Sequence, residues 1–221
     1  DKSNEITAIP ELLKILSLSG CIVTIDAMGC QKKIAADIIK KKADYLLMVK
    51  DNQKELKQQI EKMFSIGGIA DSNTHHDSGH GRVESRICDV IDDLCFMDEK
   101  ENWKGLKCIV RIRSERYNKQ TGKASTYNRY YISSLSANAE KINKAVRRHW
   151  SVENNLHWEL DVIFKEDNSL KKNGNSPKNF NVILKMAMTL LKNEKLGKLS
   201  KPSKRLKAAL DDKFRDRIMK G

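Results

Sequence analysis

The sequence predicts a mixed α/β fold with an inserted antiparallel β element and basic C-terminal helices. Two short apolar runs, residues 21–25 and 45–49, flank a stretch with helical spacing, which is typical of strands buried on both faces. Polar and apolar residues alternate over residues 82–90, 106–117 and 125–133, as they do in antiparallel sheets. Residues 170–221 then carry +11 of the net charge of +13, over segments with helical apolar spacing.

The first part of the chain reads as a βαβ unit with a helix at either side. Two parallel strands need a crossover connection, and residues 31–42 supply one as an amphipathic helix. The flanking helices are predicted at residues 6–18 and 53–64. The first has Ile9, Leu12, Leu13 and Leu16 at helical spacing.

The composition changes in the middle part of the chain. Residues 65–81 are rich in Gly, Ser, Asp and His and are predicted to form a loop. Strands are expected at residues 82–90, 106–117 and 125–133, with a turn at 118–122.

Helices return in the last third. A helical segment runs from Ala139 to about Phe164, and residues 165–175 form a polar loop. Ser176 and Pro177 then mark a helix start. Pro202 precedes a last basic helix, which is expected to place its apolar residues on one face. Those residues are Leu206, Leu210, Phe214 and Ile218.

These elements predict four parts. They are an α/β part of a core (1–64), a β-rich insertion (65–138), further core helices (139–193) and a basic C-terminal helix (194–221).

The composition favours a cytoplasmic protein. No apolar run approaches the length that crosses a bilayer, and the first residues lack a secretion signal. The five cysteines include no CxxC pair, so we expect reduced, mostly structural thiols. They are Cys21, Cys30, Cys88, Cys95 and Cys108.

The excess of positive charge favours a polyanionic partner, because each phosphate that Lys or Arg neutralises releases condensed counterions. A solvated basic tail is the plain alternative. Lys outnumbers Arg in this tail, which suits contact with a nucleic-acid backbone rather than with bases.

Asp26 is the first candidate for chemistry. It follows a buried strand directly, at the end where open α/β sheets place ligands, and Gly29 opens a turn after it. A metal-binding carboxylate and a cap on the next helix explain Asp26 equally well.

Glu153 is the second candidate. It lies one helical turn from both His149 and His157, with Asp161 a further turn on. A half-buried, hydrogen-bonded structural role and a transition-metal site of His149, Glu153 and His157 are both open, although the spacing is not that of HExxH proteases.

Other polar clusters are expected to be less informative. Asp161, Glu166 and Asp167 are predicted to be solvent-facing or capping residues. The histidines His75, His76 and His80 are predicted to lie in a mobile loop.

Several stretches resemble one family, the H-repeat-associated insertion-sequence transposases of bacteria. They match in the family's order and cover nearly the whole chain. The stretches are DKSNEI (1–6), VTIDAMGCQ (23–31), ADYLL (43–47), HGRVESR (80–86), YYISSL (130–135), RHWSVENNLHW (148–158), LDV (160–162) and ED (166–167).

The resemblance implies a DDE transposase with a partial ribonuclease H-like core. Asp26 would be the second catalytic aspartate and Glu153 the catalytic glutamate, both also metal ligands. Together they would hold Mg²⁺, with Mn²⁺ as a substitute, for cleavage and strand transfer of DNA. The implied partners are the double-stranded ends of an insertion sequence and its target, in the nucleoid and without a membrane; a homodimer is allowed.

The family's first catalytic aspartate lies on an earlier strand, upstream of Asp1, so this chain alone is expected to bind DNA without cutting it. Where related enzymes often carry Tyr and Lys near the glutamate, this chain has Val146 and Leu160. Expected DNA contacts are Arg147, Arg148, His149, Lys171, Lys172, Lys204 and Arg205. The alternatives are a non-enzymatic DNA-binding module on the helices after Ser176 and, last, a zinc hydrolase.

Overall fold

A computed structural model describes residues 5–79, 82–98, 100–118, 121–152, 158–171, 173–195 and 199–220. The chain forms two compact units, Asp1–His149 and Trp150–Gly221. None of the described helices combines the length and apolar character that crossing a bilayer requires.

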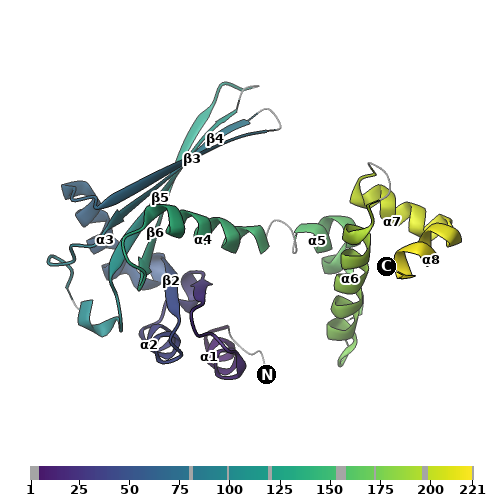
Figure 1. Ribbon diagram of the computed structural model, residues 1–221, viewed down its shortest axis with the longest axis horizontal. Coiled ribbons are helices and arrows are strands. Elements are labelled where there is room, and N and C mark those ends of the chain that lie inside the picture. The colour runs from purple at the N-terminus through teal and green to yellow at the C-terminus, as the bar shows by residue number, and fades with distance from the viewer. Residues whose placement is uncertain are drawn as a thin grey trace. The chain divides into compact units, whose positions relative to one another are not determined.

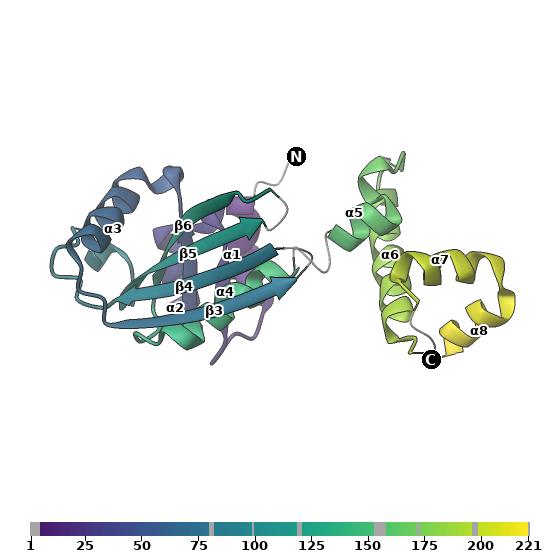
Figure 2. The same ribbon diagram turned by 90° about the horizontal axis from the view of Figure 1, so that it is seen from above.

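The first unit is built on one six-stranded sheet with strand order β1-β2-β6-β5-β4-β3 (Figures 1 and 2). Strands β1 (Ile22–Ile25) and β2 (Asp44–Val49) pair in parallel, and α2 (Lys32–Lys40) connects them. The other strands are β3 (Asp71–Gly79), β4 (Arg82–Ile91), β5 (Cys108–Asn118) and β6 (Ala124–Ser133), and their pairings are all antiparallel. The predicted mixed α/β fold and its βαβ unit are therefore confirmed, and the β-rich region continues the same sheet.

One face of this sheet packs against the helices α1 (Glu5–Ile15), α2 and α3 (Lys54–Ile66). Tyr45, Leu47 and Val49 of β2 point into this core, where they meet Ile38 of α2 and Ile60 of α3. Ile34, Ala35 and Ile38 of α2 are buried, which agrees with the predicted amphipathic helix. In α1, Leu13 is buried, whereas Leu12 is 52% exposed.

The opposite face packs against α4 (Ala139–Val152). Because side chains alternate along a strand, Leu46 and Met48 point to this side, and both are buried. Ile142 and Val146 of α4 are buried as well. Burial of β2 on both faces explains why its sequence is a continuous apolar run rather than an alternating one.

The predicted loop at residues 65–81 is wrong, because β3 occupies most of it. The sequence of β3, DSNTHHDSG, has no apolar residue, which hid the strand. Strand β3 forms because its backbone pairs with β4 over nine residues. His75 and His76 therefore lie in a strand, and His80 lies outside the described residues.

The second unit contains α5 (Trp158–Phe164), α6 (Ser176–Asn193), α7 (Lys201–Leu210) and α8 (Asp212–Lys220). Leu191 of α6 packs with Phe214 and Ile218 of α8 in a small core. The prediction of one last helix with a single apolar face is wrong. The backbone is extended at Asp211, whose carboxylate accepts the N–H of Phe214, and Leu206 and Leu210 are exposed.

Candidate active site

Asp26 lies at the carboxyl end of β1, where the chain turns into the short 3-10 helix η1 (Ala27–Gly29). Its side chain is exposed, and Oδ1 accepts the backbone N–H of Met28 at 3.2 Å. Capping of the turn therefore uses one carboxylate oxygen. Oδ2 makes no hydrogen bond within the described part of the chain, so capping and metal binding are compatible.

Two amide side chains from the neighbouring strand end hold this turn. They come from η2 (Asp51–Gln53), at the carboxyl end of β2. Asn52 Nδ2 donates to the carbonyl of Ala27 at 2.6 Å, and Gln53 Nε2 donates to the carbonyl of Cys30 at 2.9 Å. The backbone that carries Asp26 is thereby fixed from both parallel strands.

Helix α4 reaches the same strand. His149 Nδ1 lies 3.0 Å from Thr24 Oγ1, a hydrogen bond that joins the last turn of α4 to β1 two residues before Asp26. The helix is described to Val152, so Glu153 comes directly after it, and both Glu153 and His157 lie outside the described residues.

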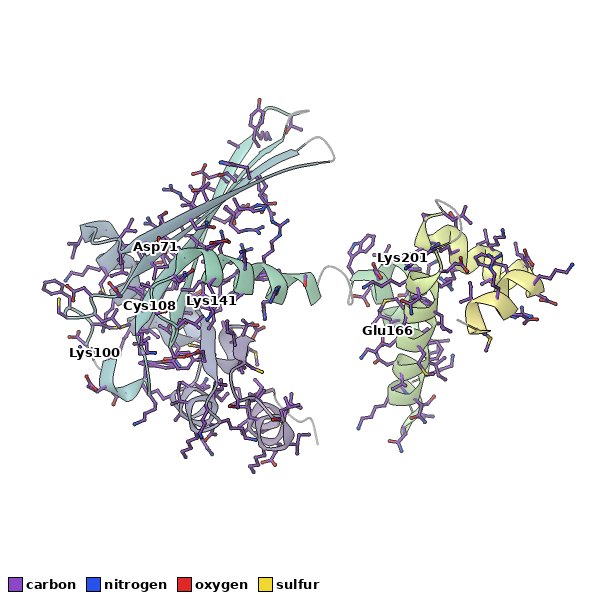
Figure 3. The ribbon with its side chains drawn as sticks, viewed as in Figure 1. Asp71, Lys100, Cys108, Lys141, Glu166 and Lys201 are labelled. Carbon is purple, nitrogen blue, oxygen red and sulfur yellow. The ribbon has the colours of Figure 1, made fainter. Side chains whose placement is uncertain are left out.

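A ladder of polar contacts fixes α4 against the edge strand β3, and it begins at Asp71, which Figure 3 labels. Asp71 accepts the N–H of Ala139 at 2.7 Å, and Asn143 donates to Asn73 at 2.9 Å. At the third rung, Arg147 Nη1 lies 2.7 Å from His75 Nε2. Two residues of strand advance about 6.8 Å and four residues of helix about 6 Å, so the rungs stay matched and set the position of α4 along β3.

The donor chemistry at Asp26 fits a hard divalent cation, because a free carboxylate oxygen is the ligand that Mg²⁺ prefers. No group of three or more His, Cys, Asp or Glu within the described ranges could hold a metal. Within these ranges Asp26 is therefore not part of a three-ligand cluster. Nδ1 of His149 is bonded to Thr24, so this nitrogen is not available to a metal.

The expected DNA contacts occupy different surroundings. Arg147, Arg148 and His149 lie in the last two turns of α4, all three already with partners in the protein. The ammonium of Lys171 lies 4.1 Å from the ring centre of Phe180, and Lys172 is outside the described residues.

Lys204 and Arg205 of α7 serve the packing of the second unit. Lys204 is buried, and its ammonium donates to the carbonyls of Leu191 and Glu194 at the end of α6. Arg205 donates to the carbonyl of Ile163 in α5. A role for these two in binding DNA stays a prediction; the ammonium of Lys204 and Nη1 of Arg205 cap other helices.

The model of the transposase DDE domain family matches residues 1–190. The chain belongs to this family. Transposase DDE domains generally use divalent metal ions, which agrees with the chemistry available at Asp26.

Similar transposase-family proteins match over essentially the whole chain. The H repeat-associated putative transposase YhhI and the putative protein YbfL, both of Escherichia coli K12, are each 42% identical over 100% of this chain and 60% of their own length. The putative transposase YncI of Escherichia coli O157:H7 is 42% identical over 99% of this chain and 57% of its own. The predicted resemblance is confirmed, and the chain spans about 60% of the length of these transposases.

Sequence reasoning missed the residues that hold the turn of Asp26 and the helix α4. Asn52 and Gln53 follow the second parallel strand within four residues, at the same sheet edge as Asp26, and that placement is a usable signal. The sequence did not indicate the pairing of Asn73 with Asn143, because that pairing depends on β3, which contains no apolar residue.

Proposed function

We propose that this chain is part of a DDE transposase with a ribonuclease H-like core, in which Asp26 and Glu153 are catalytic carboxylates. They would hold Mg²⁺, or Mn²⁺ in its place, for cleavage and strand transfer at the double-stranded ends of an insertion sequence. A dimer of the whole protein fits this function, since two ends have to be handled.

One observation carries the proposal. The hydrogen bond between Thr24 and His149 joins two segments that are 125 residues apart. It ties β1, which Asp26 directly follows, to the helix after which Glu153 comes in the sequence.

Different residues of the chain would position Asp26 and the helix α4. Asp26 stays on a turn that Asn52 and Gln53 anchor, so its free oxygen is held in place before a metal binds. The polar ladder of β3 holds α4, the helix that precedes Glu153 in the sequence. When bound, divalent metals would activate the attacking oxygen and stabilise the leaving one.

Metal binding tests this proposal. We expect Mn²⁺ to raise the melting temperature of the purified chain, and Asp26→Asn and Glu153→Gln each to abolish that rise, because a lost ligand weakens binding to the folded state. Asp37→Asn and Glu140→Gln are the control variants; they remove carboxylates of α2 and α4 that pair with Lys40 and Lys144. Equal Mn²⁺ effects in all four variants would contradict the site.

DNA cleavage tests the activity. The family has three catalytic acids and this chain supplies two candidates, so we expect it to bind supercoiled DNA without nicking it. Nicking in Mn²⁺ that disappears in Glu153→Gln would overturn the expected inactivity and support the site.

The second candidate function is a non-enzymatic DNA-binding module, which the basic second unit favours. It predicts salt-sensitive DNA binding that is indifferent both to metal and to Asp26→Asn.

A further inference from the structure

Helix α6 carries three lysines without a partner among the described residues, a property that they share with Lys165, Lys195 and Lys213. Lys178, Lys185 and Lys192 are all exposed, and their ammonium groups have no hydrogen bond, ion pair or ring contact with any described residue. The helix offers no internal partner either, since its sequence SPKNFNVILKMAMTLLKN contains no acid.

The basic residues of α7 and α8 are largely engaged inside the unit. Lys201 pairs with the buried carboxylate of Glu159, and Arg217 pairs with Glu194. Arg215 pairs with Asp212, and Lys207 lies 4.8 Å from the ring centre of Phe214. Lys204 and Arg205 donate to carbonyls at the ends of other helices. These cations are therefore already in use as structural groups.

The spacing of the α6 lysines puts them in one line. Seven residues are nearly two helical turns, so each lysine lies about 10.5 Å from the next along the axis and only about 20° around it. The stripe is about 21 Å long. A DNA duplex of that length carries about twelve phosphate charges. Because the lysine side chain is flexible, each ammonium group can reach one of several phosphates.

We propose that the Lys178–Lys185–Lys192 stripe of α6 is the surface of the second unit that binds the phosphate backbone of duplex DNA. This inference rests on the proposed function, and it names the surface by which the second unit would contact DNA. The lysine ammonium acts as a point charge and lacks the fixed set of donors that arginine has. The stripe should therefore add affinity for duplex DNA of any sequence and contribute no sequence specificity.

The test is the salt dependence of binding by the whole chain. Fluorescence anisotropy with a labelled 40-base-pair duplex of arbitrary sequence gives the affinity at several NaCl concentrations. The triple variant K178Q/K185Q/K192Q should reduce the slope of log K against log salt by about 0.9 for each lysine and weaken binding roughly 10²-fold at 0.1 M salt. Duplexes of unrelated sequence should show the same loss.

A charge-matched control separates this surface from a general effect of net charge. The variant K207Q/K213Q/R215Q also removes three exposed positive charges, from α7 and α8, and should keep most of the slope. If both triple variants lose affinity equally, or if neither loses any, the stripe is not the DNA contact. Binding of DNA by the unchanged chain, and with it the proposed function, would still stand. If the unchanged chain shows no salt-dependent binding, the proposed function fails as well.

A second measurement does not depend on variants. Acetylation of the unchanged chain by a water-soluble reagent, read by mass spectrometry, should slow at Lys178, Lys185 and Lys192 when duplex DNA is present. Lys14 and Lys40 of the first unit, which are exposed and ion-paired, give the reference rate. Equal labelling of the stripe with and without DNA overturns the proposal.

Discussion

Gly29 lies in the turn that carries Asp26, and replacing it with alanine should disturb that turn directly. A β-carbon at position 29 would lie 2.2 Å from Cγ2 of Ile25 and 3.0 Å from Cδ1 of Ile9. Carbon atoms in contact prefer about 3.5–4.0 Å, so either Ile25 or the turn has to move by more than about 1 Å. Ile25 is the last residue of β1, and its β-branched side chain has little rotamer freedom.

The size of the effect follows from this overlap. Overpacking a well-packed site costs about 1–3 kcal/mol in the free energy of unfolding. For a unit of this size, each kcal/mol lowers the melting temperature by about 2–4 °C, so Gly29→Ala should melt roughly 2–12 °C lower. Because the turn shifts with Asp26 on it, the rise in melting temperature caused by Mn²⁺ should also shrink.

The assay is a double-mutant cycle in urea, followed by circular dichroism. Ile25→Ala removes Cγ2, so it should destabilise the Gly29→Ala background less than it destabilises the unchanged chain. A coupling free energy near zero, or a melting temperature of Gly29→Ala equal to that of the unchanged chain, would refute the steric reasoning.

Two further predictions concern the first unit. Asn143→Leu and Asn73→Val should each cost about 1–3 kcal/mol of unfolding free energy, because each leaves a polar partner unsatisfied, while the double variant should be nearly neutral; additive losses in urea unfolding would contradict the pairing. Burial raises the pKa of three thiols from 9.0 to about 12, so the unfolded chain loses these protons at lower pH than the folded one. Stability should therefore fall as pH rises above 9, by up to about 1.4 kcal/mol per pH unit for each thiol, and a urea midpoint that stays constant from pH 8 to 10.5 would disprove it. The three thiols are those of Cys30, Cys88 and Cys108.

The prediction that the cysteines are mostly structural thiols agrees with the burial of three of them. Cys30, Cys88 and Cys108 are free and buried, as expected for structural thiols. Cys21, in contrast, is exposed, because β1 begins one residue later and the thiol remains outside the core. The apolar run alone did not locate where the strand becomes buried.

The sequence by itself determined the parallel strand pair, its crossover helix and the place of Asp26 at a strand end. These features depend on local apolar periodicity, which is written in neighbouring residues. It also determined the family, because the matching stretches cover nearly the whole chain.

Only the tertiary structure decided which polar residues act together. Strand β3 has no apolar residue, and it forms because β4 offers an edge and α4 offers partners for Asp71, Asn73 and His75. The basic C-terminal region looks uniform in sequence, yet Lys204 is buried while Lys185 is exposed. A hydrogen bond or ion pair between residues far apart in the chain depends on how the whole fold brings them together, and no local pattern records it.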